Sequence, residues 1–297
     1  MTDKGFKTID EQIAILSSRG LIIDNPEIAR EFLLKNNYYR ISGYSLTLRN
    51  HDIFYSNVHL QNIIDIYSFD HELRHILLSF IEQIEVNVKS VFSYEFAALY
   101  GALGYLNPAN FTDASKHGKI IAKGNEQRDR RHDHEVYIKH FMDELKQELP
   151  LWAYVDLLTI HDISILYSIA EQRVKKAVAA KFDLNMNRND EILGEFMHSL
   201  TIIRNLCAHG SRLYNRLFEQ KPSLNKREKQ LLMLNCDGTR DNAHLFGFIL
   251  VMRRLLAENE FEKLKDAILK LSSRYPFVSL KYYGFPADWQ LRLQHGQ

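Results

Sequence analysis

Apolar residues recur three or four positions apart along most of this 297-residue chain. The longest such stretch runs from Phe69 to Leu99 and contains neither glycine nor proline. Shorter stretches with the same period cover Val136–Leu149, Leu151–Lys181, Asp190–His209, Ala243–Ala257 and Phe261–Leu271. This spacing is typical of helices that bury one face. The pattern therefore predicts an all-α protein.

Polar residues mark where several helices begin and end. Thr8 and Glu11 have capping-box spacing, and Gly20 is a natural stop for the helix that they open. Asn25 and Pro26 form an N-cap and first-turn pair for a second helix. Further turns are expected at Leu106–Pro108, Pro222 and Asn235–Gly238, and a short extended piece at Tyr275–Tyr283.

The stretch Gly118–Glu135 is charged and shows little apolar period, so we expect a loop within an insertion at residues 105–135. Its end mixes Arg128, Arg130 and Arg131 with acidic residues. One interpretation is a solvated, flexible face. The other is that these arginines follow an RNA backbone, because phosphate contacts need cations but no fixed sequence.

Composition limits the kinds of partner. With 45% hydrophobic residues the chain can bury a substantial core. The 38 basic and 37 acidic residues nearly cancel, so binding to nucleic acid needs a local basic patch. Cys207 and Cys236 make no disulfide framework, and Cys207 is expected in the core. No apolar run approaches the roughly 18 residues of a membrane span, so we expect a soluble cytoplasmic protein that does not bind membranes.

The segment Ile202–Arg216 contains the largest group of candidate ligand-binding side chains. Asn205, His209, Arg212 and Arg216 follow one another at intervals of four, three and four, so a continuing helix places them on one face. The residues before them hold the apolar spacing of a buried helix: Ile192, Phe196, Leu200 and Ile203. A polar stripe of this kind is costly to bury without partners, and guanidinium groups match phosphate in charge and shape. We therefore expect the stripe to face water, another subunit or a ligand, and among ligands a phosphate fits it best.

Two further residues affect this geometry. Arg204 precedes His209 by five residues, which on a helix means about 140° of rotation and roughly 7.5 Å of rise. The two side chains of one chain therefore diverge, whereas two copies around a two-fold axis could line one cleft. Gly210 leaves two alternatives: the helix continues through it, or Gly210 is the C′ residue and Arg212 and Arg216 lie beyond the stripe.

Several blocks of the chain resemble a known family. Arg204 to His209 reads R-N-L-C-A-H and is similar to the R-N-x-x-x-H motif of HEPN-superfamily ribonucleases. With the residues up to Arg216 it resembles the Abi-like (abortive infection, AbiD/AbiF-type) proteins of bacteria. Other matching blocks are Tyr38–Tyr44, Phe69–Arg74, Ile81–Glu85, Leu149–Trp152 and Gly284–Trp289. The chain departs from the family at Gly210, where many relatives have a second histidine, at Tyr214, where tryptophan is usual, and around Asp156, Ile160 and His161.

The resemblance implies a fold and an activity. We expect a HEPN-like helical domain over residues 61–275, an N-terminal helical extension over 1–60 and a tail over 276–297. The activity implied is metal-independent cleavage of RNA by a homodimer, as in bacterial anti-phage defence and toxin–antitoxin systems. A restraining partner such as a small RNA is also implied, so RNA could be substrate, inhibitor or both.

The chemistry of the motif fits this activity. Transesterification must deprotonate the ribose 2′-hydroxyl, protonate the leaving oxygen and stabilise the charged phosphate. The imidazole of His209 can act as a general acid or a general base near neutral pH. Arg204 carries a permanent charge for the phosphoryl oxygens, and Asn205 would orient the imidazole or bond the phosphate. Arg212 and Arg216 either contact RNA or pair with acids such as Glu82 and Glu85.

Other sites and functions compete with this interpretation. The pair Glu72 and His75 has Glu-x-x-His spacing, but no second such pair is evident, so we expect no metal and no cofactor. His132, His134 and His140 lack an accompanying cysteine and a zinc-ligand spacing. The rival functions are a non-catalytic protein that holds a structured small RNA, and an interaction subunit whose Arg/His helix is a dimer face.

Overall fold

The computed structural model describes residues 5–184 and 189–294. Within them the regular structure is helical apart from one hairpin, in which β1 (Arg49–Asn50) pairs with β2 (Ile53–Phe54) in antiparallel register. The α-helices in chain order are α1 (Ile9–Ser18), α2 (Pro26–Asn36), α3 (Tyr38–Tyr44), α4 (Leu60–Tyr100), α5 (Ala114–Arg131), α6 (Val136–Lys139), α7 (Leu151–Tyr154), α8 (Ile160–Ile169), α9 (Gln172–Ala180), α10 (Asn189–Ala208), α11 (Lys226–Leu231), α12 (Phe246–Leu255), α13 (Glu258–Arg274) and α14 (Trp289–Gln294). The all-α prediction is confirmed.

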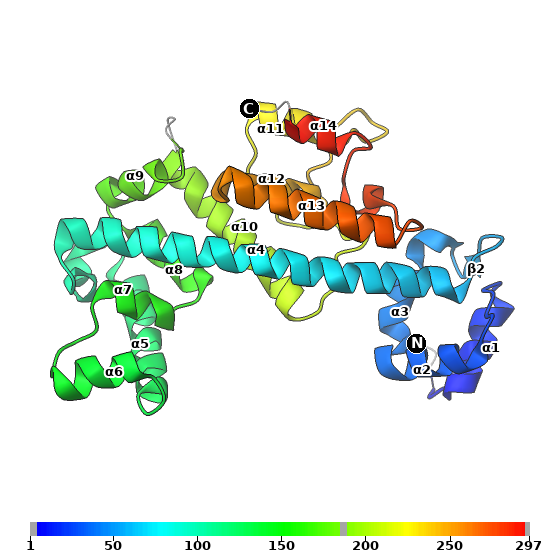
Figure 1. Cartoon of the computed structure of the whole chain (residues 1–297), viewed down its shortest axis with the longest axis horizontal. Coiled ribbons are helices and arrows are strands. Elements are labelled where there is room, and N and C mark those ends of the chain that lie inside the picture. The colour runs from blue at the N-terminus through cyan, green and yellow to red at the C-terminus, as the bar shows by residue number, and fades with distance from the viewer. Residues whose placement is uncertain (1–4, 185–188, 295–297) are drawn as a thin grey trace.

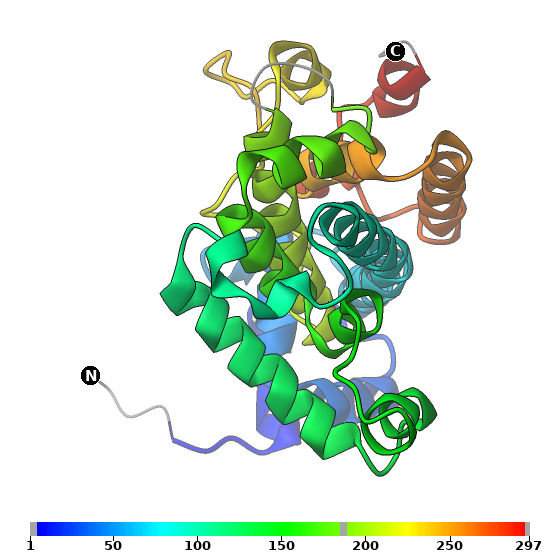
Figure 2. The same ribbon diagram turned by 90° about the vertical axis from the view of Figure 1, so that its left-hand side faces the viewer.

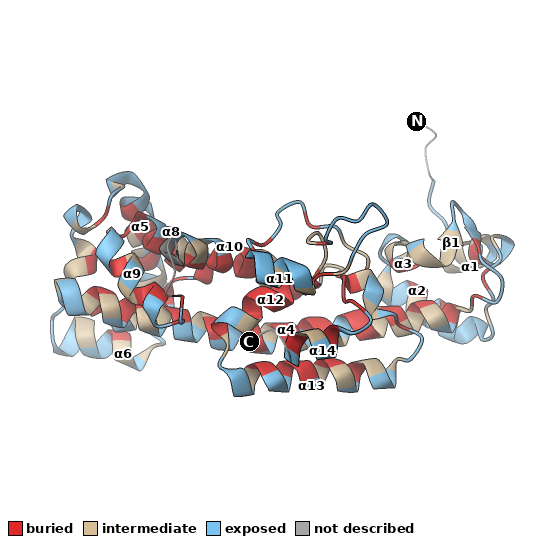
Figure 3. Ribbon diagram, turned by 90° about the horizontal axis from the view of Figure 1, so that it is seen from above, coloured by how far each residue is buried: buried red, intermediate tan, exposed pale blue. Residues whose placement is uncertain are grey.

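Helix α4 is the axis of the molecule. It contains 41 residues, which correspond to about 60 Å of helix, and it runs along nearly the whole length of the protein (Figure 1). Phe69, Leu73 and Leu77 on its inner face are completely buried. Helices α8, α9, α10 and α13 pack against it. An end-on view shows α10 beside α4 (Figure 2), and the buried residues of α4, α10 and α12 face one another (Figure 3).

The predicted starts of the first two helices are confirmed. The Thr8 hydroxyl accepts from the Glu11 amide, and the Glu11 carboxylate accepts from the Thr8 amide, which completes the capping box. Asn25 caps α2, and Pro26 is its first residue. Both helices gather with α3 and the hairpin around the N-terminal end of α4 (Figure 1). None of the helices described is both long and apolar enough to cross a membrane.

The stretch expected to be a loop, Gly118–Glu135, is helical as far as Arg131, so that expectation was wrong. Asp113 caps α5 by accepting from the Lys116 amide at 2.9 Å. Only a narrow face of this helix, around Ile120, is buried against the core. The Tyr154 hydroxyl holds the helix there by donating to the Ile121 carbonyl at 2.8 Å. Gly124 allows this approach, since a Cβ there would lie 2.1 Å from the Tyr154 hydroxyl oxygen.

Three other expectations need correction. The helix expected over Val136–Leu149 is α6, which is continued by one π-helical turn at His140–Glu144. The single pattern Leu151–Lys181 divides into α7, α8 and α9. The stretch Tyr275–Tyr283 contains a 3-10 turn at Leu280–Tyr283 and no strand. Short pieces such as these carry too few apolar repeats to be separated by period alone.

Candidate functional site

The motif segment lies at the C-terminal end of α10. Phe196, Leu200 and Ile203 are buried, as their spacing predicted, and they hold this helix against the core. The helix ends in a Schellman motif. The Ser211 amide donates to the Leu206 carbonyl at 2.8 Å and the Gly210 amide to the Cys207 carbonyl at 3.1 Å.

Gly210 has a φ of +63°, the left-handed conformation that glycine adopts at a C′ position. This decides between the two alternatives left open by the sequence: the helix ends, and His209 is its C-cap residue. The predicted four-residue stripe is therefore wrong beyond His209, because Arg212 and Arg216 lie in the segment that follows the helix.

Arg212 and Arg216 contact the backbone and a ring of their own segment, and their expected contact with RNA stays untested. Arg212 donates to the backbone carbonyls of Tyr214 and, at 3.5 Å, Asn215, and it packs on Gly43, whose added Cβ would lie 3.2 Å from its Nε. Arg216 donates to the Arg212 carbonyl at 3.3 Å and lies 5.9 Å from the Phe218 ring centroid. These guanidinium groups brace the segment after the helix.

The expected ion pairs with α4 are also absent from the residues described. Glu85 pairs with Lys89 at 3.1 Å, and Glu82 is exposed to solvent. Glu72 accepts from the Tyr275 hydroxyl at 2.7 Å and from Arg274. Among residues 5–184 and 189–294, no three His, Cys, Asp or Glu side chains are placed to hold a metal ion.

The three residues of the motif itself remain open to a ligand. Asn205 and His209 are exposed and Arg204 is half-buried. Arg204 donates to the Asn205 amide oxygen at 3.5 Å, which places guanidinium and amide side by side. Neither Arg204 nor His209 forms an ion pair with a carboxylate of the described chain. An anion that approaches this end of α10 therefore displaces no protein partner.

The structure adds Arg40, which sequence reasoning did not place at the site. This exposed residue of α3 donates to the Gly210 carbonyl at 2.5 Å, and its guanidinium lies 5.6 Å from the Tyr67 ring centroid. A second arginine thus joins the motif. The signal available in the sequence was its place in the block Tyr38–Tyr44, but spacing cannot join residues that are 170 positions apart.

Two histidines of α4 lie near Arg40. The rings of His71 and His75 are 4.6 Å apart, and His71 Nδ1 is 3.4 Å from Arg74 Nη2. Burial lowers the pKa of His71, and the positive charges of His75, Arg74 and Arg40 lower it further. Because the pKa of His71 lies below its ordinary value, its imidazole is neutral at physiological pH.

A buried carboxylate, Asp70, fixes the segment that follows the motif. It accepts from the amides of Leu213 at 3.2 Å and Tyr214 at 2.8 Å. It also accepts from the hydroxyls of Tyr44 at 2.8 Å and Tyr283 at 3.0 Å, and from Arg74. Burial raises the pKa of Asp70, whereas Arg74 and these donors oppose that shift. We call Asp70 and these five partners the Asp70 hub.

The arginines of α5 do not join this site. Arg128 pairs with Asp129 and Glu148, and Arg130 pairs with Glu126, whereas Arg131 forms no ion pair with a described residue. Helix α5 lies toward one end of the molecule and the end of α10 near its middle (Figure 1). The interpretation of these residues as part of a flexible loop was wrong, and their contact with RNA stays untested.

Residues 31–215 match the family described as Abi-like protein. This is more than half of the chain. The protein belongs to the Abi-like family. Membership indicates a role in abortive infection. The matched region contains Arg40, Asp70 and the whole motif at the end of α10, whereas α11 to α14 lie outside it. No curated protein and no solved structure matches the chain.

The C′ glycine gives a testable stability effect in this Abi-like protein. Replacing Gly210 by Ala should lower the free energy of unfolding by about 1 kcal/mol, because its positive φ disfavours a Cβ. The nearest atom to that Cβ, Arg40 Nη2 at 3.5 Å, is at ordinary contact distance, so backbone strain is the main cost. Urea unfolding measures the change. Gly118→Ala, at an exposed position inside α5 with open space around it, should instead stabilise the protein by about 0.5–1 kcal/mol.

The two cysteines should differ strongly in reactivity. Burial raises the pKa of the Cys207 thiol to about 12, and Cys236 is exposed. Because the thiolate is the reactive form, Ellman's reagent at pH 8 should titrate Cys236 alone in the folded protein and both cysteines in urea. A Cys236→Ser variant that still reacts rapidly without urea would contradict the buried placement of Cys207.

Proposed function

We propose that this protein is an endoribonuclease of abortive infection that cleaves RNA without a metal ion, at a site formed by the ends of α10 in two subunits. One observation carries the proposal. Arg204 and His209 are open to solvent with no carboxylate partner in the described chain, and Arg40 adds a third basic side chain beside them. An RNA phosphate matches this arrangement in charge and hydrogen bonding.

The way the helix ends reduces the repulsion that an anion would meet there. The last carbonyls of a helix carry partial negative charge and would repel a phosphate. Here the carbonyls of Leu206 and Cys207 accept from Ser211 and Gly210, and Arg40 covers the carbonyl of Gly210. The helix terminus is thus capped on the side where the cations lie.

The proposed reaction is a transesterification. The ribose 2′-hydroxyl loses its proton to a base and attacks the adjacent phosphorus, and the bond to the 5′-oxygen breaks as that oxygen gains a proton. The products are a 2′,3′-cyclic phosphate and a 5′-hydroxyl. His209 acts as acid or base, Arg204 stabilises the charge on the phosphoryl oxygens, and Asn205 orients the guanidinium that donates to it.

A dimer supplies what one chain lacks. The reaction needs both an acid and a base, and the motif of a single chain contains one imidazole. Two copies of the end of α10 around a two-fold axis would bring a pair of histidines and a pair of arginines to one cleft. By the same family resemblance, we expect a small RNA to restrain the enzyme in its host.

Labelled RNA incubated with the purified protein in EDTA tests the proposal. We expect shorter products that end in 2′,3′-cyclic phosphate, and their loss in an Arg204→Ala variant that remains folded. RNA retained in a salt-dependent way without products would point instead to the RNA-holding function. Absence of both cleavage and retention would leave an interaction subunit as the better interpretation.

A further inference from the structure

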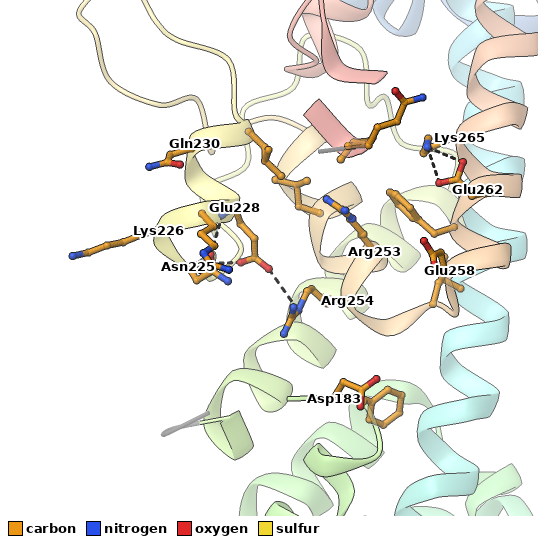
Figure 4. A pocket seen from close by; sticks show the side chains of 18 residues that line it. Asp183, Asn225, Lys226, Glu228, Gln230, Arg253, Arg254, Glu258, Glu262 and Lys265 are labelled. Atoms are coloured by element: carbon orange, nitrogen blue, oxygen red, sulfur yellow. Dashed lines mark hydrogen bonds and ion pairs between the residues drawn. The ribbon is translucent and has the colours of Figure 1, made fainter. Parts of the chain in front are cut away.

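A second site lies at the other end of α10. A cavity of about 1180 Å³ opens between α11, α12, α13 and α14, and Phe182 and Asp183 close it from the side of α9 (Figure 4). Most of its lining residues follow residue 215 and so lie outside the family match. Helix α10 begins at Asn189, six residues after Asp183, and its 20 residues correspond to roughly 30 Å of helix before the end that carries the motif.

The cavity contains a half-buried guanidinium that lacks an acidic partner. Arg253 of α12 points into it (Figure 4), with its Cζ 6.0 Å from the Phe261 ring centroid. It forms no ion pair with any carboxylate in the described residues. Burial lowers the pKa of Arg253, and the neighbouring charge of Arg254 lowers it further. Removing a guanidinium from water without giving it a hydrogen-bond acceptor costs free energy, and a bound anion would offset that cost.

The other charges around Arg253 are largely engaged. Its acidic neighbours are Glu228, Glu262 and Glu258. Both oxygens of Glu262 accept from Lys265 at 2.7 Å. Glu228 uses one oxygen to accept from the Asn225 amide at 2.7 Å, and the other lies 3.6 Å from Arg254 Nε.

The contact between Glu228 and Arg254 is therefore loose. The Glu228 oxygen that faces Arg254 is buried and has no hydrogen-bond partner among the described atoms. At 3.6 Å the pair exceeds the length of a good charged hydrogen bond. Arg254 can thus turn part of its guanidinium toward a ligand without breaking a close ion pair.

The remaining wall of the cavity is apolar. Phe261 and Leu250 are buried beneath Arg253, and Leu231 and Leu293 face the same space from α11 and α14. We propose that the cavity binds a small organic phosphate. Its anionic head pairs with Arg253 and Arg254, and its aromatic or apolar body packs on Phe261 and the leucines. Two adjacent guanidiniums suit a doubly charged phosphate better than a carboxylate.

Isothermal titration calorimetry of the full-length protein with phenyl phosphate tests this site. Phenyl phosphate should bind more tightly than inorganic phosphate, because only the former fills the apolar part, and neutral benzyl alcohol should not bind measurably. Arg253→Met should weaken phenyl phosphate binding by about 10- to 100-fold. Lys263→Met is the matched control, because Lys263 is exposed, pairs with Glu260 and does not line the cavity.

Two further variants keep the result unambiguous. Arg253→Lys retains the charge but not the planar fork, so it should fold and still bind more weakly than wild type. Arg204→Ala removes a cation of the proposed RNA site, and the phenyl phosphate binding that depends on Arg253 should persist in this variant, which separates the two sites. The proposal is overturned if wild type does not bind phenyl phosphate, or if Arg253→Met and Arg253→Lys bind it as well as Lys263→Met does. The phenyl phosphate measurements do not depend on whether the protein cleaves RNA.

Discussion

His209→Gln is expected to reduce RNA cleavage by at least about 100-fold, because glutamine can hydrogen bond but cannot exchange a proton near neutral pH. The side chain is exposed and has no hydrogen-bond partner in the described chain, so the free energy of unfolding should change by no more than about 0.5 kcal/mol. Initial rates on labelled RNA and urea unfolding of the same preparations measure the two effects.

A matched control is His134→Gln, which replaces another exposed imidazole. His134 lies between α5 and α6, two helices that lie toward one end of the molecule, whereas the end of α10 lies near its middle (Figure 1). This variant should cleave RNA at the wild-type rate. If His209→Gln retained full activity beside that control, the cleavage would have to arise from another group, and the assignment of His209 would be wrong.

Removal of the Asp70 carboxylate should cause the largest loss of stability. Asp70→Ala leaves Arg74 buried without its counter-ion and deprives four other donors of their acceptor, so we expect a loss of about 3–5 kcal/mol. That is a large part of the total stability of a typical domain. Urea unfolding monitored by circular dichroism gives the value.

Glu82→Gln provides the comparison for Asp70→Ala. Glu82 belongs to the same helix but is exposed, so this substitution should change stability by less than about 0.5 kcal/mol. A loss below about 1 kcal/mol for Asp70→Ala would mean that water replaces the carboxylate and that the Asp70 hub is not a main support of the fold.

The sequence predicted those features that depend on neighbours along the chain. The regular spacing of apolar residues identified α4 and α10, and the capping residues Thr8 and Asn25 identified the starts of α1 and α2. Helix α5 was missed because few of its residues are apolar, and a narrow buried face gives a weak periodic signal.

The candidate site was predicted only in part, for a related reason. Arg204 and Asn205 lie in the predicted helix, α10, and His209 follows its last residue, as the apolar spacing before them indicated. The conformation of Gly210 and the backbone partners of Arg212 depend on the segment beyond the helix, which has no periodic pattern. Arg40 reaches the site only through the tertiary fold.

The Asp70 hub has a consequence for synthesis of the protein on the ribosome. Its last member along the sequence, Tyr283, lies 213 positions after Asp70. Since chains begin to fold from the N-terminus while they are being translated, the hub cannot be completed until the ribosome has added Tyr283. A nascent polypeptide that includes His209 but not yet Tyr283 therefore holds the motif without the complete hub, which would delay the proposed RNA cleavage until Tyr283 has been added.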